Sequence, residues 1–267
     1  MDKPTLILVD GSGYIFRGYF AIRSMTASDG TPVNAVFGYS SMILSLLADF
    51  EPQQIVVAFD TKGPGFRHDI YPEYKANRPP APEDLVPQFA LIREATDAFG
   101  LHRVEAAGWE ADDLIATAAT KALANGQDVV IVSADKDLMQ LIRPGVRMLD
   151  PMKRRWIDEE VVREKFGCRP DQVIEVQALA GDSSDNIPGV HGIGVKTAAL
   201  LLEEYGTLEG ILEAANAIDD KGKPLIKQNK RRERLQEQAD MARISLELVR
   251  LRDDGPLDYD PEQFQNI

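Results

Sequence analysis

Nine acidic side chains recur along this sequence, and most of them stand where an apolar run ends. They are Asp10, Asp60, Glu110, Asp112, Asp113, Asp135, Asp137, Asp182 and Asp185. Carboxylates that share a pocket repel one another and raise each other's pKa, so a cluster of them needs counter-cations. Oxygen-rich ligand sets suit hard divalent ions such as Mg²⁺ or Mn²⁺. The pattern therefore indicates metal-assisted phosphoryl chemistry.

Three continuous apolar runs predict the strands that would gather these acids. The runs cover residues 6–9, 55–59 and 129–133. An aspartate of the set lies at or just beyond the end of each run, namely Asp10, Asp60 and Asp135. In open parallel sheets, ligands bind outside the carboxyl ends of the strands. We therefore expect the acids to meet at one edge of a sheet.

Helical patterns alternate with these runs. Apolar residues at helical spacing predict a helix over 34–49, so that residues 5–60 form strand, helix and strand. An alanine-rich segment predicts a second helix over 110–125, which ends before Gly126. Unbroken apolar strands that alternate with helices predict an α/β fold, with a mostly parallel sheet covered on both faces.

The rest of the chain differs from this pattern. Residues 61–90 contain six prolines and few aliphatic residues, so we expect a mobile excursion from the domain. From about residue 158 onward the chain is predicted to be mainly helical. One helix is expected to begin at Pro170 and to stop at Gly181. Three others are expected over 195–205, 207–215 and 227–248. We therefore predict an α/β domain over 1–157 and a helical domain over 158–267.

Composition excludes several classes to which this protein could belong. The 267 residues are 44% hydrophobic and 27% charged, as is usual for globular proteins. No apolar stretch reaches the ~18 residues that suggest a membrane span, and the N-terminus lacks a signal pattern, so we expect a cytoplasmic protein without a membrane partner. A single cysteine, Cys168, excludes an internal disulfide and a cysteine zinc cluster. His68, His102 and His191 lack metal-ligand spacing.

The net charge of −13 is unusual for a nucleic-acid binder, which is typically basic. Bound divalent ions would offset part of the acidic charge. Positive charge is also concentrated locally, because residues 221–234 contain seven Lys or Arg and only one acid, Glu233. A solvated helix face would have the same composition. Overall charge therefore neither supports nor excludes a DNA partner.

Two glycine motifs fail the tests for nucleotide binding. Gly11 and Gly13 follow a strand as in a dinucleotide fingerprint, but the third glycine position is Phe16. In segment 189–197, Val195 separates the last glycine from Lys196, so the Gly-Lys-Thr of a P-loop is missing.

The same segment is better interpreted as a phosphate clamp between two helices. Gly192 and Gly194 let backbone amides approach a phosphate, the next helix adds its N-terminal dipole, and Lys196 supplies a point charge. Such a helix–hairpin–helix grips one DNA strand independently of sequence. A tight turn without a ligand is the alternative.

Each of these acids also has a plain structural explanation. Acids at 110–113 complement the dipole at the start of a helix, Asp10 suits a turn, and Asp135 and Asp137 can cap a helix. The coincidence of all of them with strand ends and loops favours a common site.

Taken in order, the motifs resemble those of the flap endonuclease/5′ nuclease family. The matching features are Asp10, Asp60, Trp-Glu-Ala-Asp-Asp at 109–113, Ala-Asp-Lys-Asp at 134–137, Gly-Asp-Ser-Ser-Asp-Asn-Ile-Pro-Gly at 181–189 and the glycine hairpin. The likeness runs from Leu6 to about Leu251 and is greatest to the 5′-3′ exonuclease domains that precede bacterial DNA polymerases. It implies a PIN-like core with a helical arch and a C-terminal helical region, and a polymerase portion beyond Ile267.

The resemblance also implies roles for individual residues. One metal would be held by Asp10, Asp60, Glu110, Asp112 and Asp135, and a second by Asp137, Asp182 and Asp185, with Asp113 in support. A basic arch would lie at about 61–90. Within it, Lys75 and Arg78 would touch the scissile phosphate and Tyr74 would stack on a base, with Arg17 near the phosphate. The hairpin, at about 186–205, would bind duplex DNA through Gly192, Gly194 and Lys196, and the family's K⁺ site would lie there.

We therefore expect a monomeric 5′-3′ exonuclease and flap endonuclease that hydrolyses branched or 5′-ended duplex DNA, such as flaps, nicks and primer ends, in primer removal and repair. Two ions about 3.5–4 Å apart would activate water and stabilise the leaving oxygen. Lys75 and Arg78 would counter charge on the phosphate. A PIN-class ribonuclease and a non-enzymatic junction binder remain as alternatives; the hairpin and arch argue against the first, and the nine acids against the second.

Overall fold

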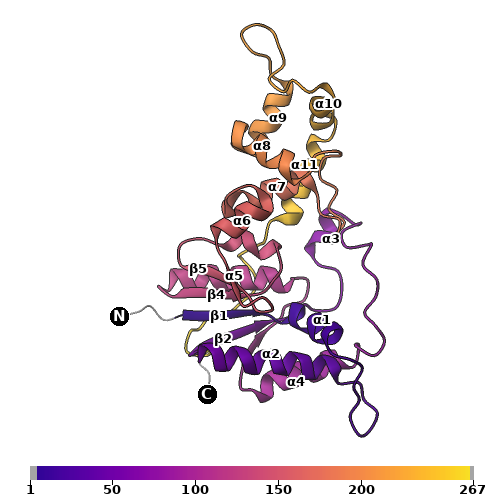
Figure 1. The fold of residues 1–267 in the computed structure, drawn as a ribbon, viewed down its shortest axis with the longest axis vertical. Helices are drawn as coiled ribbons and strands as arrows, with labels where there is room; N and C mark the ends of the chain where they lie inside the picture. The colour runs from indigo at the N-terminus through magenta and orange to yellow at the C-terminus, as the bar shows by residue number, and fades with distance from the viewer. Residues whose placement is uncertain (1–4, 265–267) are drawn as a thin grey trace.

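The computed structural model describes residues 5–264, which form a six-stranded sheet flanked by helices and a helical region at one end (Figure 1). The strands are β1 (Thr5–Asp10), β2 (Gln54–Ala58), β3 (His102–Val104), β4 (Asp128–Val132), β5 (Val146–Asp150) and β6 (Arg155–Ile157). Their order is β3-β2-β1-β4-β5-β6, and neighbours run parallel except for the antiparallel pair β5 and β6. The predicted α/β class with a mostly parallel sheet is confirmed.

Alternate residues of each strand face opposite sides, and each side has its own core. Leu6 and Leu8 of β1 belong to the cluster that includes α5 (Ala111–Ala124) and the helical region. Ile7 and Val9 belong to the cluster under α1 (Gly11–Ala21), α2 (Asn34–Phe50) and α4 (Gln88–Ala98). Burial on both faces explains why the strands read as unbroken apolar runs.

Helix α1 was missed in the sequence, where only one helix was expected before residue 60. Asp10 caps it: the Gly13 N–H donates to Asp10 Oδ1 over 2.7 Å. Gly18 lets α1 pack tightly on α2, because a Cβ added at Gly38 would lie 2.6 Å from Gly18 Cα. Glycines at 11, 13 and 18 therefore serve helix capping and packing rather than a loop.

Between β6 and residue 249 the chain is mainly helical. The elements are α6 (Glu159–Phe166), the 3-10 helix η2 (Pro170–Gln172), α7 (Val173–Ala180), α8 (Val195–Tyr205), α9 (Leu208–Asn216), α10 (Asn229–Glu237) and α11 (Ala239–Val249). The single helix expected over 227–248 is wrong. It breaks at Gln238, whose backbone leaves the helical region and whose Oε1 accepts from the His191 N–H.

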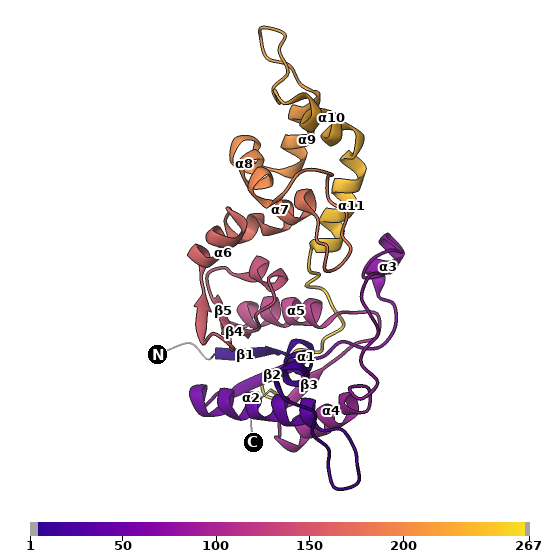
Figure 2. The same ribbon diagram turned by 45° about the vertical axis from the view of Figure 1, so that its right-hand side comes forward.

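Two segments connect the helical region to the sheet. Residues 61–87 rise from the sheet edge to α3 (Phe66–Ile70), which contacts α11, and return to α4 (Figure 2). After α11 the chain runs back across α5, where the Gly255 N–H donates to Thr117 Oγ1, and reaches β2, where the Ile55 N–H donates to the Phe264 carbonyl. No helix within residues 5–264 is long and apolar enough to cross a membrane.

Candidate active site

Asp10 marks the carboxyl end of β1 and is 6% exposed. Besides capping α1, it accepts a 2.8 Å hydrogen bond from Ser133 Oγ at the end of β4. Burial raises its pKa to about 6, with help from the charges of Asp135 and Asp60, while the bonds from Gly13 and Ser133 act in the opposite direction. A Cβ at Gly13 would lie 2.3 Å from Asp10 Oδ2, so a larger residue there would displace this carboxylate.

Asp112 lies in the first turn of α5 and has a pKa well above its usual value. Burial is the main cause, followed by the negative charges of Asp135, Asp10, Asp60 and Asp137. Acids that follow three different strands, β1, β2 and β4, therefore act on this one carboxyl. Asp60 also connects to the helix directly, because its Oδ1 accepts from the Ala111 N–H over 2.8 Å.

Asp135 and Asp137 follow β4, at the start of the 3-10 helix η1 (Asp137–Leu141). The Asp135 N–H donates to Ser133 Oγ, and the Asp137 N–H donates to Asp135 Oδ1. Gln177 of α7 donates to Asp137 Oδ1 over 2.6 Å. Burial and the charge of Asp135 raise the pKa of Asp137 to about 7. The buried Gln177 Oε1 has no hydrogen-bond partner in the structure.

Asp182 belongs to the same group, because its negative charge also raises the pKa of Asp137. The Ser184 N–H donates to Asp182 Oδ1, and Lys136 Nζ lies 2.5 Å from Oδ2. Burial acts to raise the pKa of Asp182, but the bonds from Lys136 and Ser184 outweigh it and lower the pKa.

Glu110 and Asp185 form a second group, under the segment that follows α3. Lys75 Nζ lies 2.6 Å from Glu110 Oε1 and 3.7 Å from Asp185 Oδ2, and Arg78 pairs with Asp185. The Tyr74 hydroxyl donates to both acids, over 3.1 and 3.2 Å. The predicted arch cations and two of the predicted metal ligands therefore do meet.

Tyr74 is placed differently from the role that the resemblance implied, whereas the supporting role of Asp113 stays a prediction. Tyr74 is 3% exposed, so its ring cannot stack on a base in this conformation. Asp113 is fully buried and points to Arg67, which donates to both of its carboxylate oxygens. Adjacent residues of a helix differ by about 100° around its axis, so Asp113 turns away from the acids around Asp112.

The hairpin lies apart from the acids. Gly192 has φ +76°, which favours glycine, and Gly194 is the N-cap of α8, with Lys196 exposed in the first turn. A Cβ at Gly192 would meet Arg234 Nη1, which shows that part of the basic run 221–234 lies beside the hairpin. Arg17 lies in α1 close to Tyr14, and its charge partly opposes the rise that burial causes in the pKa of that phenol.

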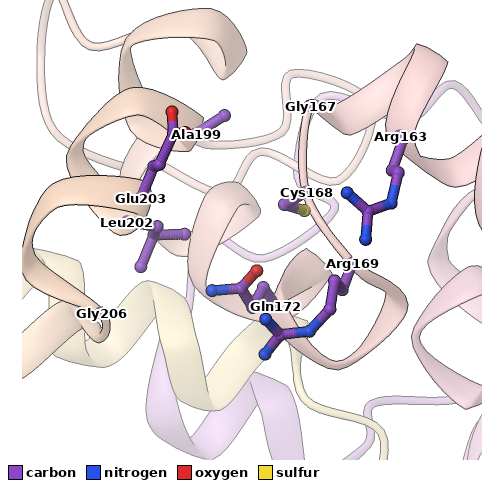
Figure 3. Close-up of a pocket in the computed structure, with 9 residues that line it drawn as sticks. All are labelled: Arg163, Gly167, Cys168, Arg169, Gln172, Ala199, Leu202, Glu203 and Gly206. Carbon is purple, nitrogen blue, oxygen red and sulfur yellow. The ribbon is translucent and has the colours of Figure 1, made fainter.

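A hollow of about 460 Å³ lies between α6, η2 and α8, away from all these residues (Figure 3). Its arginines are paired, Arg163 with Glu159 and Arg169 with Asp171. Burial raises the pKa of its cysteine, Cys168, to about 11, so the thiol stays protonated at neutral pH. The hollow therefore adds no reactive group to the candidate site.

The acids fit hard divalent cations by charge and by ligand type. The pKa values of Asp10, Asp112 and Asp137 are all raised, which means that the protein itself supplies too little positive charge for these carboxyls to be ionised together. Divalent cations would supply that charge. Within residues 5–264, no three Asp, Glu, His or Cys side chains already stand in metal-binding geometry. Lys75, Arg78 and Lys136 instead hold Glu110, Asp185 and Asp182.

Sequence reasoning missed four residues that contact these acids: Ser133, Lys136, Gln177 and Arg67. Ser133 and Lys136 had a local signal, since both lie in the stretch that carries Asp135. Gln177 and Arg67 had none, because they reach the acids only through tertiary contacts.

Comparison with known proteins decides the family. The N-terminal resolvase-like domain of 5′-3′ exonucleases matches residues 5–167, and the C-terminal SAM fold of the same enzymes matches residues 168–266. The chain belongs to the 5′-3′ exonuclease family. The PIN-like core with a C-terminal helical region, implied by the resemblance, agrees with this family.

Relatives of this 5′-3′ exonuclease chain include much longer proteins. DNA polymerase I of Rhizobium leguminosarum is 52% identical over 96% of the chain, which spans only 25% of that relative. T5 5′-exonuclease with bound zinc is 25% identical over 92% of the chain and 89% of its own, with a TM-score of 0.75. T5 flap endonuclease, in a pseudo-enzyme–product complex with DNA and metal ions, is 26% identical over the same shares, with a TM-score of 0.75.

Proposed function

We propose that this chain is a structure-specific 5′ nuclease that hydrolyses DNA phosphodiesters as a 5′-3′ exonuclease and flap endonuclease. The observation that carries the proposal is the position of Asp112. It is half-buried, and the charges of Asp135, Asp10, Asp60 and Asp137 act on it at the carboxyl ends of parallel strands, where such folds bind ligands. Family membership and the cations of the segment above the acids support it.

The acids would hold two divalent ions, Mg²⁺ or Mn²⁺. Asp10, Asp60, Asp112 and Asp135 would hold one of them, with Glu110 entering when Lys75 is released to DNA. The second ion would be held by Asp137, Asp182 and Asp185. When bound, such ions lower the pKa of an attacking water and stabilise the charge on a leaving oxygen. Metal ions bound to T5 5′-exonuclease and to T5 flap endonuclease support a metal site in this chain.

The protein's own side chains would bind and orient the DNA. Lys75 is 21% exposed and Arg78 53% exposed, so both can turn from their acids towards a phosphate. Arg is suited to bidentate contact with phosphate oxygens. Gly192, Gly194 and Lys196 would hold the duplex beside the site through backbone amides and one positive charge. A K⁺ ion at this hairpin is part of the proposal.

We assign nuclease chemistry to residues 1–157 and duplex binding to residues 158–267. Branched or 5′-ended DNA would be the substrate, in primer removal and repair. The chain would act as a cytoplasmic monomer joined to a polymerase portion, as the DNA polymerase I relatives suggest, since it spans 25% to 30% of their lengths.

A 5′-flap duplex labelled at its 5′ end tests the proposal, incubated with Mg²⁺, with Mn²⁺ and with a chelator. We expect metal-dependent release of the flap by the wild type, and almost none by Asp112→Asn, with little change in DNA binding. A chain that binds the flap but never cuts it would be a junction binder. Preferred cutting of a matched RNA flap would indicate a PIN-class ribonuclease.

A further inference from the structure

Arg67 is the largest side chain that the described part of the structure buries completely, with 2% of it exposed. An arginine has five N–H groups, and all five are used. Nη1 and Nη2 donate to Asp113 over 2.7 and 2.8 Å, and Nη1 also donates to Glu110 over 3.4 Å. Nε donates to the Leu248 carbonyl and Nη2 to the Arg250 carbonyl, over 2.8 and 3.1 Å.

These five bonds join three segments that are far apart in the sequence. Arg67 belongs to α3, its carboxylate partners to the start of α5, and its carbonyl partners to the end of α11. The arginine therefore fixes the base of the arch against both the acids and the helical region.

Arg67 differs in this respect from the cations of the arch that can reach DNA. The side chain of Arg78 is 53% exposed and has one acidic partner, Asp185. A phosphate could reach Arg67 only if its bonds to Asp113 and to two backbone carbonyls were broken. Direct contact with DNA is therefore excluded for Arg67 in this conformation.

The carboxylates bound by Arg67 control the first turn of α5. Asp113 Oδ2 accepts from the Glu110 N–H over 3.3 Å, and Asp113 Oδ1 accepts from the Arg252 N–H over 2.9 Å. Glu110 in turn bonds Tyr74 and Lys75 of the arch. A shift of Arg67 would therefore displace the turn that carries Asp112.

We propose that Arg67 is a positioning residue that sets the acids of the α5 first turn for metal binding and locks the arch to them. The proposal rests on the metal site of the proposed function. Groups that orient the ligands of a metal through hydrogen bonds typically change metal affinity about 10- to 100-fold when they are mutated. Arg67 is expected to act in this range through Asp113 and Glu110.

Trp109 offers a signal that needs neither metal nor DNA. Its ring lies 5.6 Å from Phe66, next to Arg67 in the sequence, and 4.6 Å from the Arg252 guanidinium. The chain has two tryptophans, so a Trp156→Phe background isolates the emission of Trp109. Loosening of α3 from α5 would expose Trp109 to water and shift its emission to longer wavelength.

The main variant is Arg67→Lys, which keeps the charge but cannot make the paired bonds to Asp113 or the two carbonyl bonds. Arg243→Lys is the matched control, with the same change at an exposed arginine that makes paired bonds to Glu209 and contacts none of the acids of the proposed metal site. Mn²⁺ is titrated calorimetrically into DNA-free protein at 20 °C, and flap cleavage is measured in single turnover. Circular dichroism establishes folding. If Arg67→Lys does not fold, Asp113→Asn, which keeps the side-chain volume, removes the charged end of the same pair.

We expect Arg67→Lys to bind Mn²⁺ about 10- to 100-fold more weakly, to cleave more slowly at saturating DNA, and to red-shift Trp109. Its DNA affinity and the salt dependence of that affinity should match the wild type. Arg243→Lys should leave Mn²⁺ affinity and Trp109 emission unchanged.

Two results would overturn the role of Arg67. A folded Arg67→Lys with wild-type Mn²⁺ affinity and Trp109 emission, but a lower melting temperature, would make the arginine purely structural. A smaller salt slope of DNA binding would make it a phosphate contact. If the wild type itself neither bound Mn²⁺ nor cut the flap, the proposed function would fail instead. The Trp109 measurement would still decide whether Arg67 holds the arch.

Discussion

Ser133 Oγ and Asp10 Oδ2 lie 2.8 Å apart and join the ends of two neighbouring strands, β4 and β1. Both side chains are buried. The same hydroxyl also accepts from the Asp135 N–H, so it holds two acids of the proposed metal site at once. A neutral hydroxyl thus orders the acids without neutralising them, which leaves their charge for a cation.

Replacing Ser133 by Ala should weaken metal binding and stability together. The Asp10 carboxylate and the Asp135 amide each lose a buried partner, which typically costs about 1–3 kcal/mol. Chemical denaturation and Mn²⁺ titration measure the two effects. Ser41→Ala is the control, since that exposed hydroxyl bonds only its own helix, at the Phe37 carbonyl. Equal effects of the two substitutions would contradict the role of Ser133.

Metal-free protein should lose stability as pH rises from about 4 to 7. Asp10 and Asp137 have folded pKa values of about 6 and 7, above the 3.8 of an exposed Asp, so the folded state binds more protons in this range. The free energy of unfolding therefore falls with rising pH. Mg²⁺ should restore more stability at pH 8 than at pH 5, because protons compete with it at low pH.

Thermal melts with Mg²⁺ and with a chelator measure this effect. Asp137→Asn removes one of the two titrating groups, so its chelated form should show a shallower decline between pH 4 and 7. A chelated wild type whose melting temperature rose steadily over that range would contradict the burial of uncompensated acids.

Lys75→Ala and Lys196→Ala should separate chemistry from binding. Lys75 contacts Glu110 and Asp185, so its loss should lower the single-turnover rate on a 5′ flap by about 10²–10³-fold. Lys196 is exposed at the start of α8, so its loss should mainly weaken DNA affinity and reduce the salt slope by about one. Unchanged single-turnover chemistry in Lys75→Ala would remove this lysine from the site.

Gly38→Ala should destabilise the fold by about 1–3 kcal/mol. The added methyl group would lie 2.6 Å from Gly18 Cα, so α1 and α2 would have to separate. Because α1 begins at Asp10, flap cleavage should fall as well. Urea unfolding measures the loss, with Ser41→Ala on the same helix as the control. A fully stable Gly38→Ala would show that the two helices can move apart without cost.

Short-range patterns in the sequence were enough to predict the α/β class, the acids at the strand ends and most of the helices. Apolar runs and helical spacing are local properties, and parallel strands end at one edge by geometry. The same approach missed α1, because three glycines in eight residues weaken the local helical signal. Their function in capping and close packing depends on α2, more than a dozen residues later.

The neighbours Asp112 and Asp113 mark the boundary between what the sequence by itself determined and what only the tertiary structure decided. Helix geometry alone required them to face different ways. The neighbouring sequence, however, does not indicate which of the two lies near other acids and which is neutralised by a cation. Arg67, 46 residues away, pairs with Asp113 because the arch packs on α5, and this leaves Asp112 among like charges. Chain order fixes the identity of the acids, whereas long-range packing assigns each one its partner.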